Sequence, residues 1–398
     1  MTEVLTFGCR LNTLESEIIR GLAAHLPDTV VVNTCAVTHA AERDARHAIA
    51  RLHRTRPCTA IVVTGCAAQI DPASWSSLPG VTRVLGNTEK LRPEHWHPHA
   101  GTSAAPITAR THAPVPATGL ETRARAFLDV QQGCDHACTF CIIPQGRGPS
   151  RSAPLEAAIA QARTLVEHGT QEIVLTGVDL ASVQPGLATL IDSLLAALPG
   201  LPRLRLSSLD PAMLDDAFWR TYATEPRLMP HLHLSLQAGA DLVLKRMRRR
   251  HTSAEALATI RRARALRPGT AIGADLIAGF PTETDAHHAE TLDFVNAAAI
   301  PYLHVFPYSP RSGTPAARMP QLPPATRRHR AAALREAGQR HAAAFHAAML
   351  GQRVAIVTER NNRGHTEHFA PVTGDFPVPN RLEHRRVVAT SAAGLEVA

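Results

Sequence analysis

The sequence predicts an α/β protein with three parts: an N-terminal parallel α/β domain, a central partial (βα)6 barrel of the TIM type, and a small C-terminal all-β module. The first observation is that short apolar segments alternate with helical patterns over most of the chain. The second is that the residues after position 350 contain only short strand-like segments. The third is the length, because 398 residues exceed what a single hydrophobic core usually holds.

The N-terminal domain is predicted to span residues 1–96. Asn12 and Glu15 have the spacing of a capping box, which predicts that a helix begins near Asn12. A second helix is predicted over residues 40–54. The predicted strands are short apolar segments at residues 4–7, 29–33 and 60–63. Residues 97–119 are rich in Pro, Ala, Thr and His without periodicity, so they are predicted to be a linker.

The central domain is predicted to span residues 120–349 and the C-terminal module residues 350–398. Six βα units over about 220 residues suit a partial barrel, whose functional groups would lie at the C-terminal ends of the strands. The helices are predicted from residues 152–154 to Gly169 and at 187–197, 254–266, 286–298 and 327–350. The strands are predicted at residues 126–130, 172–175, 203–207, 231–236, 272–277 and 302–306, and in the module at 354–357, 368–372 and 386–389.

Composition narrows the possible classes of protein. With 44% apolar and 19% charged residues, the chain is not a disordered protein. It has no apolar run of the ~20 residues that a membrane helix needs, and its start lacks a signal-peptide pattern. We therefore expect a cytoplasmic protein without a membrane partner. The net charge of +8 is weak evidence for nucleic acid, because all basic residues except two lysines are arginines and genome composition alone can favour arginine.

Three cysteines form a compact triplet, Cys134-Asp-His-Ala-Cys138-Thr-Phe-Cys141, directly after the first predicted strand of the barrel. Three thiolates within eight residues can surround one soft metal centre. A 4Fe–4S cluster usually takes four cysteines, so a cluster held here would leave one iron open to another ligand. A thioredoxin-like redox pair and a Cys₃His zinc site with His136 are the alternatives.

Three further cysteines, Cys9, Cys35 and Cys66, are far apart in the sequence, but each follows a predicted strand by two or three residues. The loops after parallel strands meet at one edge of a sheet, so we expect the three thiols to converge and to form a second cluster site. The alternative is that they are three buried apolar residues, which is common for free cysteine. Cys58 precedes its strand and is interpreted as an incidental thiol.

The compact triplet at this place in a six-unit βα barrel resembles the radical S-adenosylmethionine (SAM) enzymes. The N-terminal domain with its three dispersed cysteines resembles the methylthiotransferase domain. The C-terminal module, with residues 364–372, resembles the TRAM RNA-binding domain. Together these resemblances cover the whole chain except the linker, and they imply a radical SAM methylthiotransferase.

The segment Phe7-Gly-Cys-Arg-Leu-Asn12 resembles the subfamily that acts on N6-threonylcarbamoyladenosine in tRNA. Residues 32–38, 231–237, 244–249 and 305–310 also resemble that subfamily. The pair Arg10-Leu11 separates it from the subfamily that acts on N6-isopentenyladenosine, which is the alternative within the class. A zinc-stabilised RNA-binding protein without catalysis is the alternative from another class.

The resemblance implies the cofactors and the partners. It implies SAM and two 4Fe–4S clusters, one on Cys134, Cys138 and Cys141 and the other on the dispersed triplet. One cluster and SAM would generate a radical that removes hydrogen from C2 of the adenine at tRNA position 37, and the other would deliver sulfur. The expected partners are tRNA, an external electron donor of the flavodoxin or ferredoxin type, and an unknown sulfur donor.

Polar residues at the predicted strand ends are candidates to bind SAM, although each could instead be a turn residue. Arg147 and Arg151 follow the compact triplet and are candidates to bind an anion of the substrate or of SAM. Arg248 lies in the basic segment 245–251 and is a candidate partner of the SAM carboxylate. The strand-end candidates are Gly177, Ser208, Asp210, Ser235, Gln237 and Asp275.

Overall fold

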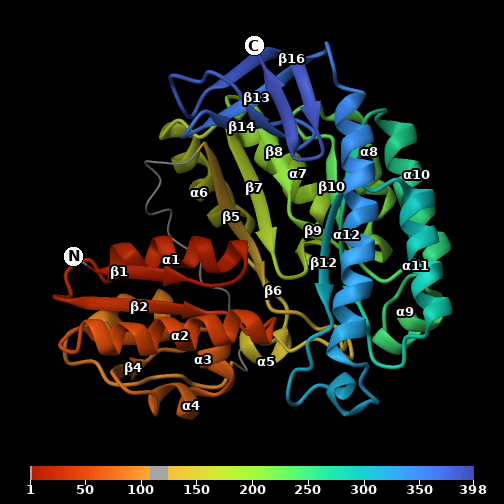
Figure 1. The fold of residues 1–398 in the computed structure, drawn as a ribbon. Helices are drawn as coiled ribbons and strands as arrows, with labels where there is room; N and C mark the ends of the chain where they lie inside the picture. Colours follow the sequence, from red (N-terminus) through yellow and green to blue (C-terminus); the bar gives the residue numbers. More distant parts are fainter. Residues whose placement is uncertain (1, 108–123) are drawn as a thin grey trace.

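The computed structural model describes residues 2–107 and 124–398 (Figure 1). Residues 2–107, called the N-terminal layer below, form a parallel sheet in the order β1-β2-β3-β4. Val30 and Val32 pack toward α2 and Val31 packs toward α1, so helices cover both faces. The elements are β1 (Glu3–Thr6), α1 (Arg10–Leu22), β2 (Thr29–Thr34), α2 (His39–Thr55), β3 (Ala60–Gly65), α3 (Cys66–Ile70), α4 (Pro72–Ser76) and β4 (Val81–Val84).

The central region is an open barrel of two four-stranded sheets, β6-β5-β7-β8 and β9-β10-β11-β12. Apart from β6, which is antiparallel to β5, the paired strands are parallel. The largest core lies between the strands and the surrounding helices. The strands are β5 (Arg125–Gln132), β6 (Arg151–Ser152), β7 (Glu172–Gly177), β8 (Arg203–Leu206), β9 (Ser208–Leu209), β10 (His231–Gln237), β11 (Ala271–Ala278) and β12 (Tyr302–Pro307).

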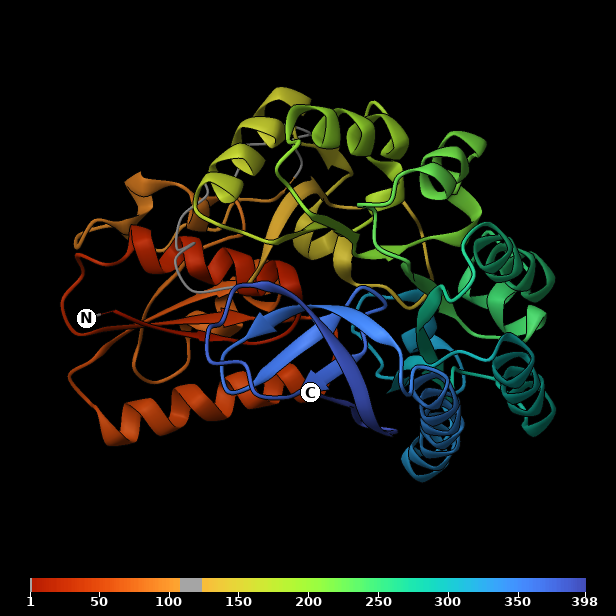
Figure 2. The same cartoon turned by 90° about the horizontal axis from the view of Figure 1, so that it is seen from above.

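Helices surround the strands of the central barrel, as the predicted (βα)6 fold requires (Figure 2). Of the helices in the described ranges, none combines the length and the apolar character that a bilayer-spanning helix needs. The helices are α5 (Ile143–Arg147), α6 (Leu155–Glu167), α7 (Leu187–Ala197), α8 (Asp216–Thr224), α9 (Asp241–Met247), α10 (Ser253–Leu266), α11 (Asp285–Ala298) and α12 (Pro324–Ala347).

The C-terminal module is a closed five-stranded barrel in the order β13-β14-β15-β17-β16. It lies against the N-terminal ends of the central strands, where Arg205 of β8 donates to the carbonyl of Thr366 at 3.2 Å. The opposite end of the central barrel is therefore left for the cysteine loop (Figure 1). The strands are β13 (Arg353–Glu359), β14 (Arg363–Thr366), β15 (Pro371–Thr373), β16 (Leu382–Ser391) and β17 (Gly394–Val397).

The predicted capping box at Asn12 and Glu15 is wrong. Helix α1 begins at Arg10, with Cys9 at its N-cap, so both residues lie inside the helix. Asn12 instead donates to the carbonyls of Phe7 and Thr34, at 2.7 and 2.9 Å. Asn12 and Glu15 thus have the spacing of a capping box, but they are buried polar residues that join α1 to neighbouring segments.

Three other expectations need correction. The single strand predicted over residues 368–372 is wrong, because the chain turns at Phe369, which has a φ of +67°, between β14 and β15. The short strands β4 and β17 were not predicted. The first part of the predicted linker belongs to the N-terminal layer, where Ser103 forms a bridge beside Leu85. Residues 108–119 of that linker lie outside the described residues.

Candidate functional site

The loop after β5 carries Cys134, Cys138 and Cys141 at the C-terminal end of the strand, which is the functional end of a βα barrel. The backbone N–H of His136 lies 3.4 Å from Cys134 Sγ. Arg249 Nη1 lies 3.5 Å from Cys138 Sγ. N–H donors directed at sulfur stabilise thiolates and tune iron–sulfur clusters, so this loop has the donors that such a cluster needs.

The dispersed cysteines converge as the sequence predicts. Cys9, Cys35 and Cys66 follow β1, β2 and β3 at one edge of the sheet. A Cβ on Gly8 would lie 2.6 Å from Cys35 Sγ, so only glycine, here with a φ of +103°, allows the first loop to approach the second cysteine. Asn87 Nδ2 lies 3.7 Å from Cys66 Sγ. Three thiols from three separate loops therefore form one site.

Burial makes the charged thiolate form unfavourable in both cysteine sites. Burial, followed by the thiols of Cys66 and Cys9, raises the pKa of Cys35 to about 12. Burial also raises the pKa of Cys134 to about 12 and that of Cys141 to about 11. A bound metal deprotonates its coordinating thiols. The two sets of three soft donors thus fit two iron–sulfur clusters, each with one iron open to another ligand.

The zinc alternative for the compact triplet requires His136 as a ligand. In the structure, His136 Nε2 lies 2.9 Å from Asp179 Oδ2. The ligand atoms of Cys134, His136 and Asp179 lie within 4.8 Å of one another, so His136 is near one cysteine of the loop. His136 thus already has a carboxylate partner in Asp179, which a Cys₃His zinc site would have to displace or include.

Helix α5, directly after the compact loop, joins the two cysteine sites. Asn87 Nδ2 donates to the carbonyl of Gly146 in α5 at 2.6 Å. Arg147 donates to both carboxylate oxygens of Glu15, at 2.9 and 3.0 Å, and Lys90 Nζ donates to the same carboxylate at 2.7 Å. Burial raises the pKa of Glu15, but Arg147 and Lys90 outweigh it and hold the value at about 2. The expectation that Arg147 binds a substrate anion is therefore wrong, because its donors are already used.

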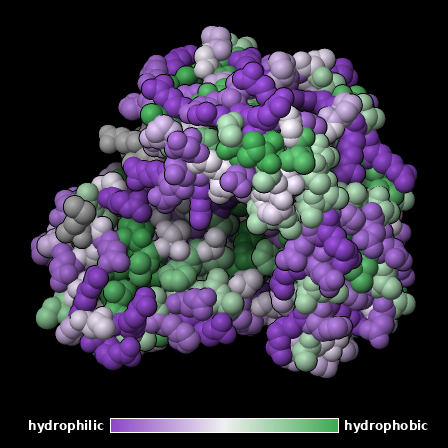
Figure 3. All heavy atoms as spheres, turned by 45° about the horizontal axis from the view of Figure 1, so that its top comes forward, coloured by the Kyte–Doolittle hydropathy of each residue, from purple (hydrophilic) through white to green (hydrophobic). Residues whose placement is uncertain are grey.

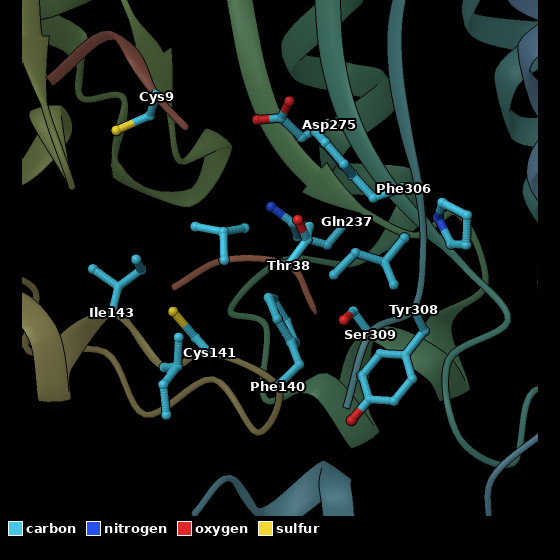
Figure 4. Close-up of a pocket in the computed structure, with 14 residues that line it drawn as sticks. Cys9, Thr38, Phe140, Cys141, Ile143, Gln237, Asp275, Phe306, Tyr308 and Ser309 are labelled. Carbon is cyan, nitrogen blue, oxygen red and sulfur yellow. The ribbon is translucent and has the colours of Figure 1, made fainter. Parts of the chain in front are cut away.

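A pocket of about 330 Å³ lies between the two cysteine sites, with Cys9 on one side and Cys141 on the other (Figure 4). Val37 and Phe306, which are 45% and 41% exposed, lie on its wall, and exposed apolar side chains of this size often mark a binding surface. A hollow is visible in the space-filling view (Figure 3). The lining residues are Cys9, Val37, Thr38, Phe140, Cys141, Ile142, Ile143, Gln237, Asp275, Ile277, Phe306, Pro307, Tyr308 and Ser309.

Four of the residues that we predicted as SAM ligands come together inside the barrel. Ser208 Oγ lies 2.7 Å from Ser235 Oγ and 3.3 Å from Asp275 Oδ2. Gln237 and Asp275 both line the pocket. Gly177 lies at the end of β7 and does not line this pocket.

Asp210 and the basic segment after α9 form a second group beside the compact loop. Arg248 is exposed, at the left-handed C-cap of α9, and the structure gives it no contact with the site. Its neighbour Arg249 donates to Asp210 Oδ2 at 3.1 Å as well as to Cys138. Thr139 Oγ1 donates to the carbonyl of Arg246 at 2.8 Å, which fixes the cysteine loop to this segment. Of the three consecutive arginines, the structure thus places Arg249, and not the predicted Arg248, against the compact loop.

Two histidines of the site were missed. Asp275 Oδ1 lies 3.1 Å from His233 Nε2 and 3.3 Å from His304 Nδ1. Burial raises the pKa of Asp275, but the two histidines outweigh it and lower the value well below the usual range. The signal was present in β10, where alternate residues from His231 to Gln237 are polar and share one face.

Family comparisons divide the chain in the same way as the cysteine sites. Residues 128–295 match the family described as the Radical SAM superfamily. Residues 2–86 match the family described as uncharacterized protein family UPF0004. Each matched range contains one of the two cysteine triplets.

Curated relatives match almost the whole chain. The threonylcarbamoyladenosine tRNA methylthiotransferase MtaB of Rickettsia prowazekii is 44% identical over 94% of this chain and 91% of its own length. That of Bacillus subtilis is 36% identical over 79% of this chain and 74% of its own. The tRNA-2-methylthio-N(6)-dimethylallyladenosine synthase of Erythrobacter litoralis is 35% identical over 90% of this chain and 86% of its own.

Among solved structures, the radical SAM methyltransferase TsrM from Kitasatospora setae, with cobalamin and a [4Fe-4S] cluster bound, has a TM-score of 0.55. It is 15% identical to this chain, and the match covers 77% of this chain and 69% of that chain. At this identity the likeness shows the fold, an α/β layer beside an open radical SAM barrel. With the relatives above, it follows that the chain belongs to the threonylcarbamoyladenosine tRNA methylthiotransferase (MtaB) family and carries a radical SAM domain.

Proposed function

We propose that this protein transfers a methylthio group to C2 of N6-threonylcarbamoyladenosine at tRNA position 37, giving the 2-methylthio derivative. The observation that carries the proposal is the shared pocket, which is lined by Cys9 of one triplet and Cys141 of the other (Figure 4). A reaction that needs a radical and a sulfur atom at the same carbon requires both sites to open onto one substrate space. The names and the 44% identity of the first relative support this substrate.

The proposal assigns six cysteines as ligands of two 4Fe–4S clusters. When bound, the clusters and SAM supply the radical that removes the C2 hydrogen and the sulfur and methyl group that replace it. We assign the auxiliary cluster to a domain of residues 1–96 and the SAM-binding cluster to a domain of residues 120–349, connected by residues 97–119, of which Ser103 pairs with the N-terminal sheet. The ligands are Cys9, Cys35 and Cys66 for the auxiliary cluster and Cys134, Cys138 and Cys141 for the SAM-binding cluster.

The chain's own side chains position SAM and exclude water. Ser208, Ser235, Gln237 and Asp275 offer hydrogen-bond partners on the inner face of the barrel. Apolar side chains on the pocket wall, among them Phe140, suit a purine ring and keep a radical away from solvent. We add Arg249 to the binding residues in place of Arg248, because it faces Cys138 and Asp210. We keep Gly177 as a candidate to contact SAM through its backbone. We keep Asp210 as a residue that acts through Arg249, whose guanidinium donates to it.

Residues 350–398 are proposed to bind the tRNA backbone. Arg353 and Arg386 are direct cross-strand partners in β13 and β16, and both are exposed. Like charges placed opposite each other destabilise a sheet, and a bound polyanion would neutralise both. A tRNA substrate also places the reaction in the cytoplasm. Reduction of the SAM-binding cluster requires an external donor, for which we propose a flavodoxin or ferredoxin.

Nucleoside mass spectrometry of bulk tRNA from cells with and without the gene tests the proposed substrate. We expect the deletion to abolish 2-methylthio-N6-threonylcarbamoyladenosine and to accumulate its precursor without the methylthio group. Loss of the isopentenyl counterpart instead would assign the substrate of the Erythrobacter relative to this chain. If neither nucleoside changes, the proposed function is wrong. Iron analysis separates the remaining alternative, because a zinc-stabilised RNA-binding protein contains no iron.

A further inference from the structure

Three arginines surround one aromatic ring at the junction of the three parts of the molecule. The guanidinium carbons of Arg10, Arg125 and Arg205 lie 5.7, 5.1 and 5.0 Å from the centre of the Phe369 ring. Arg10 comes from α1, Arg125 from β5, Arg205 from β8 and Phe369 from the turn between β14 and β15. We call the three arginines the arginine cluster.

Two members of the arginine cluster have carboxylate partners. Arg205 donates to both oxygens of Glu172, at 2.7 and 2.9 Å. Arg125 Nη2 lies 2.8 Å from Glu359 Oε1. Both pairs are buried or half-buried, and Glu172 also lies 3.7 Å from Arg203, so neither carboxylate is left to pair with Arg10.

Arg10 has no such partner. In the described part of the chain, its guanidinium makes no hydrogen bond and no ion pair, and the aromatic face of Phe369 is its closest recorded contact. The side chain is half-buried. Arg125 and Arg205 lie against the same ring, so two other cations surround Arg10. A cation in this position can bind an anion at little cost in desolvation.

His231 is a second polar group beside the arginine cluster without a partner. It is 2% exposed, and neither ring nitrogen has a hydrogen-bond partner among the described residues. Its ring centre lies 5.0 Å from that of Phe369. Burial, followed by Arg205, lowers the pKa of His231 well below its usual value, so it is neutral and offers one N–H donor. Two unpartnered donor groups therefore face the same place.

The location of Arg10 connects the arginine cluster to the substrate pocket. Arg10 follows Cys9, which lines the pocket, and consecutive Cα atoms are about 3.8 Å apart. Asp275, also on the pocket wall, interacts electrostatically with Arg10. His233 and His304 pair with the carboxylate of Asp275, and no ion pair between Asp275 and Arg10 is recorded among the described residues. Arg10 itself does not line the pocket, so a substituent on a bound adenine would reach it past Asp275, along the inside of the barrel.

We propose that Arg10, with His231 beside it, binds the carboxylate of the substituent on N6 of the substrate adenine and thereby selects a carboxylate-bearing nucleoside over an apolar one. This inference rests on the proposed function and names the group that determines its specificity. An apolar isopentenyl group in this place would leave the charged, half-buried Arg10 without a hydrogen-bond acceptor. Sites built to bind a polar group strongly reject analogues that lack it.

The test compares two anticodon stem-loop RNAs on the anaerobically reconstituted full-length protein. One carries the threonylcarbamoyl group, and in the other the threonine carboxylate is replaced by a neutral carboxamide. We expect the Arg10→Gln variant to lower kcat/KM for the carboxylate RNA by about 10- to 100-fold and to change that for the carboxamide RNA by about twofold or less. Dissociation constants of both RNAs, measured without turnover, should show the same difference. Arg10→Lys should recover part of the preference because it keeps the charge.

Arg20→Gln is the matched control, because Arg20 is exposed on the same helix. It should behave as the unmodified protein does, and iron content should be unchanged in every variant. An Arg10→Gln variant that keeps the preference for the carboxylate overturns the inference. Equal weakening of both RNAs also overturns it, because the arginine then binds a backbone phosphate or only packs on Phe369. If the unmodified protein cleaves SAM but methylthiolates neither RNA, the proposed function itself fails.

Discussion

The two cysteine sites reach the same pocket by opposite routes. Cys134, Cys138 and Cys141 lie in one loop of eight residues, whereas Cys9, Cys35 and Cys66 come from three loops at one edge of a sheet. The compact site takes its geometry from the sequence spacing alone. The dispersed site takes its geometry from the register of β1, β2 and β3, so it exists only while the sheet is intact. The compact site therefore depends on its own loop, whereas the dispersed site depends on the whole N-terminal sheet.

Removal of a ligand from the compact site should have the largest effect. We expect Cys138→Ala to abolish SAM cleavage and methylthiolation together, because two cysteines would leave two irons of a 4Fe–4S cluster without a cysteine ligand. About four irons per protein should remain on the dispersed site. The measurement is 5′-deoxyadenosine formation with iron and sulfide analysis. Continued formation of 5′-deoxyadenosine would refute the assignment of the radical to this site.

Removal of a ligand from the dispersed site should stop methylthiolation but not SAM cleavage. We expect Cys35→Ala to keep SAM cleavage, because the compact loop is held by α9 and not by β2. Methylthiolation of tRNA should be lost. Nucleoside analysis of the reacted tRNA measures this, and a normal yield of methylthio product would show that the dispersed cysteines serve no sulfur transfer.

The ion pair that joins the two sites should affect stability next most strongly. Glu15 is 2% exposed and, among the described residues, is the only carboxylate in a recorded ion pair with Arg147 or Lys90. Glu15→Gln leaves two buried cations without their counter-ion, which costs about 3–5 kcal/mol of unfolding free energy. Chemical denaturation measures this cost, and Glu94→Gln, at an exposed position, is the control. An unfolding free energy equal to that of the control would show that the network does not hold the two sites together.

The arginines after α9 provide a smaller test of the compact site. We expect Arg249→Gln to lower kcat/KM by about 10- to 100-fold, since it removes a charge-assisted contact to Cys138 and Asp210. Arg248→Gln should change kcat/KM by about twofold or less, because that side chain is exposed. Steady-state kinetics on tRNA measure both. The opposite order would restore the expectation from the sequence.

The contrast between the sites also explains what the sequence could reveal. Strand order, six βα units and both cysteine sites follow from periodicity and from placement after strands, and the structure confirms this α/β architecture. The role of Glu15 could not be predicted, since its partners Lys90 and Arg147 come from distant segments. Arg248 and Arg249 are equivalent in sequence, and only the left-handed backbone at position 248 decides which one faces the site.

The smallest predicted effect is on the unfolding free energy and concerns β5, the strand that positions the compact loop. Asp129 of β5 is 1% exposed, and burial raises its pKa to about 7. Because the folded pKa lies above the unfolded value, about 3.9, the stabilising protonated form is complete below pH 4 and is lost as the pH rises to 7. Between pH 5.5 and 6.5 this amounts to at most about 1.4 kcal/mol of unfolding free energy. Asp129→Asn should remove the loss, because asparagine does not titrate and keeps an acceptor for Gln132. Chemical denaturation of both proteins at pH 5.5 and 6.5 measures this change in unfolding free energy. If the variant's unfolding free energy depends on pH as much as that of the unmodified protein, groups other than Asp129 cause the dependence.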